Sequence, residues 1–130
     1  MDDQKKTVFF IDDDMTNLKI GRNNLSGHFQ IVTAASGEKL FSLLEKLTPA
    51  LIVLDIEMPE MNGYQVFEKL RSDEKTSNIP VLFLSAKDDV FLRPEGFSGF
   101  RADFEKKPFS KEVLIERINT MIAKYDATDQ

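Results

Sequence analysis

Four short strand-like segments of this chain each run into polar side chains, and the chemical kind differs between segments. These polar residues are Asp12, Asp13 and Asp14 after residues 8–11, Asp55 after residues 51–54, Ser85 after residues 81–84 and Lys107 after residues 103–106. Carboxylates bind hard divalent cations such as Mg²⁺, while hydroxyl and ammonium groups bind phosphoryl oxygens. If the segments are parallel strands of one sheet, these groups meet at one edge and could hold a cation beside a phosphoryl group.

The elements that would position these groups alternate between strand and helix. Strand-like segments occupy residues 8–11, 30–34, 51–54, 81–84 and, more weakly, 103–106, and helical patterns occupy residues 16–26, 36–47, 63–72 and the stretch after Ser110. Ser36 and Ser110 are candidate N-caps. Inward-facing residues are predicted at Leu40, Leu43, Leu44 and Leu47, and at Leu114, Ile118, Met121 and Ile122. This alternation predicts an α/β fold with a parallel sheet covered by helices on both faces.

The chain is most simply one doubly wound (βα)5 domain over residues 1–125, followed by a polar tail at residues 126–130. Residues 86–102 are the least regular part of the pattern. Pro94 would interrupt a helix there because proline lacks the N–H group that a helix requires. We therefore expect a short or distorted helix in this stretch.

Composition restricts the classes of function. The chain has 130 residues, no cysteine and a formal net charge of −5, with no basic stripe for direct nucleic-acid binding. Apolar runs of about four residues are far shorter than the roughly 20 that a membrane helix needs, so a cytoplasmic location without membrane association is expected. The one histidine, His28, follows Gly27 and is predicted to be an exposed turn residue rather than a metal ligand.

Each polar strand end has an ordinary explanation when it is taken alone. An acidic triplet is usually a solvated turn, a serine after a strand is often a cap, and a lysine before proline is usually on the surface. Asp55 differs because it ends a fully apolar strand, where a carboxylate is partly removed from water at a cost in free energy. Neighbouring carboxylates would also repel one another, and a bound Mg²⁺ would relieve that repulsion.

Together, four motifs resemble the receiver domain of two-component response regulators over essentially the whole chain. They are Phe10-Ile11-Asp12-Asp13-Asp14, the run from Leu54-Asp55 through Glu57-Met58-Pro59 to Asn62-Gly63-Tyr64, Leu84-Ser85-Ala86-Lys87 and Lys107-Pro108-Phe109. The segment from Asp55 to Gly63 is the most specific. The resemblance implies a flavodoxin-like sheet with strand order 2-1-3-4-5. The sequence departs from the receiver pattern at Phe100 and Arg101, where a small Gly-Ala turn is usual.

The resemblance also implies a role for each site residue. Asp55 would accept a phosphoryl group from a phosphohistidine or a small acyl phosphate. Asp13, Asp55 and the backbone carbonyl of Glu57 would hold Mg²⁺, with Asp12 acting mainly through a bound water, and Asp14 has no direct role. Lys107 would contact Asp55 or its phosphoryl group.

The remaining implied roles concern the conformational switch, the lifetime of the phosphoryl group and the binding partners. Ser85 would hydrogen-bond a phosphoryl oxygen in the active state, and Phe104 would be the switching aromatic residue. Glu57 and Lys87 occupy positions that tune loss of the phosphoryl group, and we hypothesise that their opposite charges pair and slow it. The input partner would be a sensor histidine kinase or a histidine phosphotransfer protein. The downstream effector and the oligomeric state, a homodimer among the alternatives, stay open.

Two other functions fit parts of the sequence. Asp12-Asp13-Asp14-Met15-Thr16 matches the Asp-x-Asp-x-Thr pattern of haloacid-dehalogenase-like phosphatases, in which Asp12 would be the nucleophile and Asp14 the acid–base. That family needs a further acidic motif after its lysine, and nothing past Lys107 supplies one. The other alternative is a binding module with a receiver-like fold that no longer switches.

Overall fold

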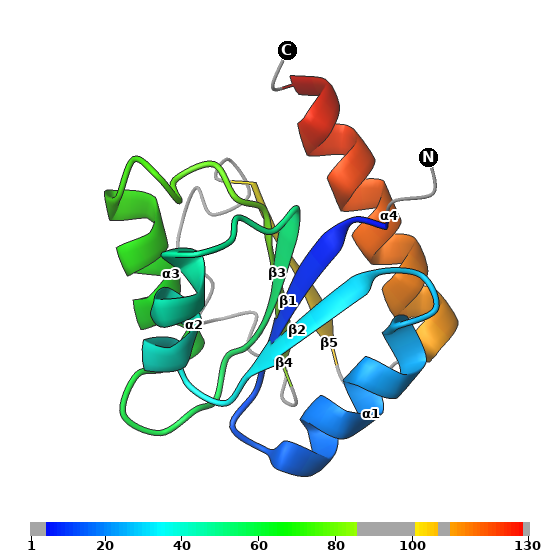
Figure 1. The fold of residues 1–130 in the computed structure, drawn as a ribbon, viewed down its shortest axis with the longest axis horizontal. Helices are drawn as coiled ribbons and strands as arrows, with labels where there is room; N and C mark the ends of the chain where they lie inside the picture. The colour runs from blue at the N-terminus through cyan, green and yellow to red at the C-terminus, as the bar shows by residue number, and fades with distance from the viewer. Residues whose placement is uncertain (1–4, 86–100, 107–109, 129–130) are drawn as a thin grey trace.

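The computed structural model describes residues 5–85, 101–106 and 110–128, with side chains described as far as Tyr125. Within these ranges the chain forms an α/β sandwich (Figure 1). The predicted distorted helix at residues 86–102 lies almost entirely outside the described residues, as do Lys87 and Lys107. Among the helices that the structure describes, none is long and apolar enough to cross a membrane.

Five parallel strands form one sheet in the order β2-β1-β3-β4-β5. Their bounds are β1 Thr7–Ile11, β2 Gln30–Ala34, β3 Leu51–Asp55, β4 Val81–Ser85 and β5 Ala102–Lys106. Every residue of β3 and β4 is buried, as expected for central strands covered on both faces. The predicted strand order 2-1-3-4-5 is therefore confirmed, and the order reverses between β1 and β3, where open α/β sheets place their binding sites.

Helices cover both faces of the sheet. Their bounds are α1 Met15–Leu25, α2 Gly37–Leu44, α3 Gly63–Ser72 and α4 Lys111–Thr128. Figure 1 shows α2 and α3 on one face and α1 and α4 on the other. Because side chains alternate along a strand, each strand contributes to two separate cores. Phe9, Ile52 and Phe83 pack toward α2 and α3, whereas Phe10 and Leu82 pack toward α1 and α4.

Most predicted boundaries agree with the structure within a residue or two, and His28 is exposed in a turn as predicted. One predicted helix boundary is wrong. Helix α2 ends at Leu44, because the N–H groups of residues 45 and 46 bond to carbonyls three residues back instead of four. Leu47 consequently leaves the inward face and is 46% exposed. Helix α4 continues to Thr128, since no glycine or proline ends it earlier, so residues 126–128 of the predicted tail are helical.

The departure from the receiver pattern before β5 has a structural counterpart. Arg101 adopts a left-handed backbone conformation with φ 60°, which costs a non-glycine residue roughly 1–2 kcal/mol. Its carbonyl accepts a hydrogen bond from Arg71 at 3.4 Å, and the Arg71 guanidinium lies 4.5 Å from the Phe67 ring centroid. Burial, and to a lesser extent the charge of Arg101, lowers the pKa of Arg71 to about 10. Arg101 directly precedes β5, at the edge of the sheet opposite to the one where Asp55 lies.

Candidate functional site

The structure brings the predicted acidic residues together at the carboxyl edge of the sheet. Ile11 of β1 pairs with Leu54 of β3, so the next residues along the two strands are Asp12 and Asp55. Carboxylate oxygens of Asp12, Asp13 and Asp55 all lie within 4.8 Å of one another. Asp12 and Asp55 are buried, at 2% and 5% exposure, while Asp13 is exposed to solvent. The three carboxylates therefore form one acidic site that is open to solvent on the side of Asp13.

Backbone and side-chain donors fix the orientation of Asp12. Its Oδ1 accepts a hydrogen bond from the Asp14 N–H at 3.0 Å, and its Oδ2 accepts one from Asn17 Nδ2 at 3.2 Å. Both carboxylate oxygens thus already have a protein partner.

The start of α1 assigns a structural role to Asp14. The Asp14 side chain is the N-cap of the helix and accepts a hydrogen bond from the Thr16 N–H at 2.9 Å. With Asp14 as the cap, Asn17 is the third helical residue, and its amide reaches back to Asp12. The sequence interpretation did not single out Asn17. An N-cap aspartate beside the acidic site would have been the signal, because it fixes which side chains of the first turn face the strand end.

Asp55 is held by the backbone of the loop that follows it. The N–H of Ile56 donates to the carbonyl of Leu84 on β4, and the N–H of Gly63 donates to the carbonyl of Ile56 at 2.9 Å. A Cβ atom on Gly63 would lie 2.8 Å from the carbonyl oxygen of Asp55. Asn62 caps α3 in a reciprocal capping box with Gln65, which fixes the end of the loop. The start of α3 therefore packs directly on the backbone of Asp55.

Ser85 lies at the same edge of the sheet. It is the last residue of β4, one step beyond Leu84, which pairs with Asp55, and it is buried at 5% exposure. On its other side it pairs with Lys106, the last residue of β5. The sheet thus places the hydroxyl-bearing residue next to the acidic residues, and it ends β5 immediately before Lys107 in the sequence. Lys107 itself lies outside the described residues.

Phe104 belongs to an aromatic cluster on the α3 side of the sheet. Its ring stacks on that of Phe83 with a centroid distance of 5.2 Å, and Tyr64 lies 5.5 Å from Phe83 and 6.4 Å from Phe104. Phe67 completes the cluster at 5.4 Å from Phe83. Phe104 is half-buried. The cluster joins β4, β5 and the first turns of α3.

The chemistry of the donors fits Mg²⁺. The three clustered side chains all offer carboxylate oxygens, the hard ligands that Mg²⁺ prefers. The exposed position of Asp13 leaves the cluster open to water and substrate oxygens, which Mg²⁺ normally keeps in its coordination shell. Glu57, two residues beyond Asp55 in the loop, could add its backbone carbonyl.

Comparison with known proteins agrees with this geometry. A family model for the response regulator receiver domain matches residues 8–119. The chain belongs to this family. Receiver domains are phosphorylation-dependent signalling switches that work with histidine kinases and effectors, and they are not conventional enzymes.

Individual relatives show how such a domain is used. The chain is 38% identical over 121 residues to hybrid signal transduction histidine kinase D of Dictyostelium discoideum, spanning 92% of this chain and 8% of that protein. It is 35% identical over 125 residues to the probable transcriptional regulator ycf27 of Cyanophora paradoxa, spanning 95% of this chain and 51% of that protein. The chain thus spans about half, or much less, of the length of these relatives.

A solved structure shows the same fold. A putative response regulator from Chloroflexus aurantiacus superimposes with a TM-score of 0.83 at 28% identity, covering 92% of this chain and 99% of that one. The receiver fold predicted from the motifs is therefore confirmed.

Replacing Asn17 by alanine should weaken Mg²⁺ binding about tenfold, because residues that orient the groups around a bound metal and its waters typically contribute 10–100-fold to affinity. Loss of the Asn17 amide would free Oδ2 of Asp12 to rotate away from the site. Isothermal titration calorimetry of the unphosphorylated protein with Mg²⁺ measures the change. Asn23→Ala, at an exposed position of the same helix, is the control. Equal affinities in wild type and both variants would contradict the role given to Asn17.

Proposed function

We propose that Asp55 is the phosphoacceptor of this receiver domain and that the acidic edge carries out Mg²⁺-dependent phosphoryl transfer onto it. One observation carries the proposal: the Asp55 carboxylate is buried at the carboxyl end of the central strand, within 4.8 Å of the carboxylates of Asp12 and Asp13. A buried acidic cluster of this kind is unfavourable unless a cation or a phosphoryl contact compensates it. The family membership makes phosphoryl transfer the matching chemistry.

Each residue would contribute through position and charge. An Asp55 oxygen would attack phosphorus, forming a P–O bond while the P–N bond of a phosphohistidine, or the P–O bond of an acyl phosphate, breaks. Asp13, Asp55 and the Glu57 carbonyl would hold Mg²⁺ and Asp12 would act through water. When bound, Mg²⁺ supplies positive charge next to the transferring phosphoryl oxygens.

Two residues would respond to the new phosphoryl group. Ser85 would donate its hydroxyl hydrogen to a phosphoryl oxygen, and Lys107 would place its ammonium beside the same group. Movement of Ser85 would pull on β4 next to the aromatic cluster, where Phe104 stacks on Phe83. We expect Phe104 to repack in response, which would alter the surface that an effector reads.

Acetyl phosphate with Mg²⁺ tests this function directly. Intact-mass measurement should show the addition of one phosphoryl group, and peptide mapping should place it on Asp55. An adduct on Asp12 would instead support the phosphatase alternative, which the capping role of Asp14 already disfavours. The absence of any adduct, with no response of the protein to Mg²⁺, would support a binding module that no longer switches.

The partners of the full-length protein are also proposals. A sensor histidine kinase or histidine phosphotransfer protein would supply the phosphoryl group, in line with the hybrid kinase among the relatives. A cytoplasmic location is the setting that fits these partners. Residues 1–125 would form the receiver itself.

The lifetime of the phosphorylated state should depend on Glu57 and Lys87. Glu57 is exposed in the loop after Asp55, and Lys87 lies outside the described residues. If their charges pair over the site, the double variant Glu57→Gln with Lys87→Met should lose its phosphoryl group several-fold faster, since water would reach phosphorus more easily. Autodephosphorylation after removal of acetyl phosphate measures the rate, with Glu68→Gln on the exposed side of α3 as control. An unchanged rate would contradict the pairing.

A further inference from the structure

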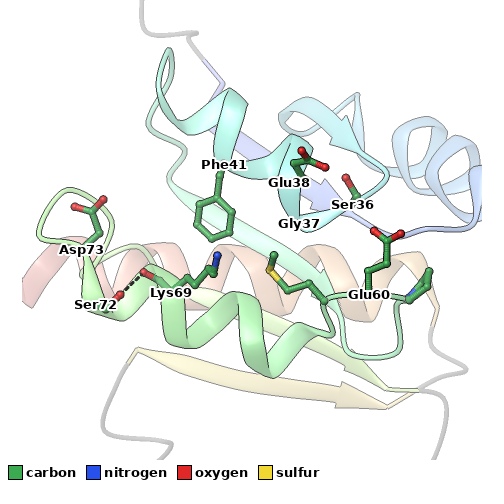
Figure 2. Close-up of a pocket in the computed structure, with 10 residues that line it drawn as sticks. Ser36, Gly37, Glu38, Phe41, Glu60, Lys69, Ser72 and Asp73 are labelled. Atoms are coloured by element: carbon green, nitrogen blue, oxygen red, sulfur yellow. Dashed lines mark hydrogen bonds between the residues drawn. The ribbon is translucent and has the colours of Figure 1, made fainter.

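A groove lies between α2 and α3, beside the loop that follows Asp55. It has a volume of about 690 Å³, and its lining includes Glu38, Phe41, Glu60, Met61, Lys69 and Asp73. We call this the α2–α3 groove. Figure 2 shows Phe41 projecting from α2 toward Lys69, with Asp73 at one end and Glu38 and Glu60 at the other. A second hollow of about 680 Å³ shares Phe41 and Asp73 with it and extends to Leu47.

The groove combines an apolar floor with an acidic rim. The half-buried Phe41 ring and the Met61 side chain form the apolar part, and Leu47 adds a 46% exposed leucine next to it. Three carboxylates line the α2–α3 groove, those of Glu38, Glu60 and Asp73, against one ammonium, that of Lys69. That ammonium lies 5.9 Å from the centroid of the Phe41 ring, so the ring face already accommodates a cation.

We propose that the α2–α3 groove is the docking site for a basic segment of the effector protein. An arginine or lysine of that segment would lie between Glu38 and Glu60, and an apolar side chain would pack on Phe41 and Leu47. An acidic or phosphate-bearing partner would meet the three carboxylates and be repelled. A second copy of this chain, docking groove to groove, would bring together two surfaces that each carry three carboxylates and one ammonium, so their net charges would repel.

The groove shares a wall with the phosphorylation site. Residues 56–62 begin directly after Asp55, include Glu57, and then supply Pro59, Glu60 and Met61 to the groove. Gly63 closes this loop against the carbonyl of Asp55, and the start of α2 packs on it, since a Cβ on Gly37 would lie 3.0 Å from the Met61 sulfur. A structural change at Asp55 would therefore be transmitted to Glu60 through this short, packed loop.

Binding of a basic segment to the groove does not depend on the proposed function. Only its regulation by phosphorylation rests on Asp55 being the phosphoacceptor. Coupling between two sites is reciprocal: if phosphorylation changes peptide affinity by some factor, bound peptide changes the equilibrium constant for phosphorylation by the same factor.

Two synthetic helical peptides test the groove. One carries arginines along one face and leucines along the other, and the second has glutamates in place of the arginines. The arginine peptide should shift the amide resonances of Glu38, Phe41 and Glu60 in the ¹⁵N-labelled protein. The double variant Glu38→Lys with Glu60→Lys should bind it roughly tenfold or more weakly. Glu112→Lys with Glu116→Lys, an equal charge change at exposed positions of α4, should bind it as wild type does.

Several outcomes would overturn the proposal. They are equal binding by the two double variants, equal binding of the two peptides, and shifts confined to another face. Self-association that the Glu38 and Glu60 reversals abolish would assign the groove to a second copy instead. Repeating the titration with acetyl phosphate and Mg²⁺ separates the two proposals. An Asp55 that takes no phosphoryl group refutes the proposed function alone, while a phosphorylated protein with unchanged peptide affinity refutes the regulatory coupling.

Discussion

Asp55→Asn is expected to take up no phosphoryl group from acetyl phosphate under conditions that label the wild-type protein completely. The asparagine keeps the size and shape of the side chain, so the strand end and its packing should persist. It removes the carboxylate that would attack phosphorus. Intact-mass measurement before and after incubation gives the result, and circular dichroism confirms that the fold is retained.

The neighbouring acidic residues provide the internal comparison. Asp13→Asn should still be labelled, but more slowly and only at higher Mg²⁺ concentration, because it would remove a metal ligand rather than the nucleophile. Asp14→Asn should behave like wild type, since asparagine is as good an N-cap as aspartate for α1. Labelling that persists in Asp55→Asn, or that disappears in Asp14→Asn, would refute the assignment of Asp55.

The acidic edge could be predicted because its positions depend on strand order alone. Asp55 and Ser85 end strands so apolar that only the centre of a sheet could bury them, and parallel pairing then fixes which end they share. Asn17 could not be found in this way, because its contact with Asp12 depends on where α1 begins relative to β1. That start is set by the cap at Asp14, a local feature that the acidic triplet concealed.

The α2–α3 groove shows a different limit. Periodicity assigned Leu47 to the inward face of one long helix, in line with Leu40, Leu43 and Leu44. The helix instead ends at Leu44, where the Leu43 carbonyl accepts hydrogen bonds from two successive N–H groups. This early end exposes Leu47 beside Phe41 and opens the second hollow. Apolar spacing by itself does not distinguish a continuing helix from a turn that keeps the same spacing for one more residue.

Gly63→Ala should be among the most damaging small substitutions in this chain. Its Cβ would lie 2.8 Å from the carbonyl oxygen of Asp55 and 2.9 Å from the Cα of Ile56, and both are backbone atoms that cannot rotate away. Forcing atoms into packed space typically costs about 1–3 kcal/mol, a large share of the roughly 5–15 kcal/mol that stabilises a domain. Urea denaturation should show this loss as a lower midpoint. Moving the start of α3 also displaces Asp55, so we expect phosphorylation to slow roughly a hundredfold.

Gly27→Ala is the matched control, because a Cβ there would meet no atom within 4 Å. It changes the unfolded chain in the same way as Gly63→Ala but leaves the folded structure without a clash. Its stability should therefore stay close to wild type, and its phosphorylation rate should not change. A Gly63→Ala protein with lowered stability but a normal rate would show that the loop can shift without moving Asp55. The same result would remove the route by which the α2–α3 groove is proposed to sense phosphorylation.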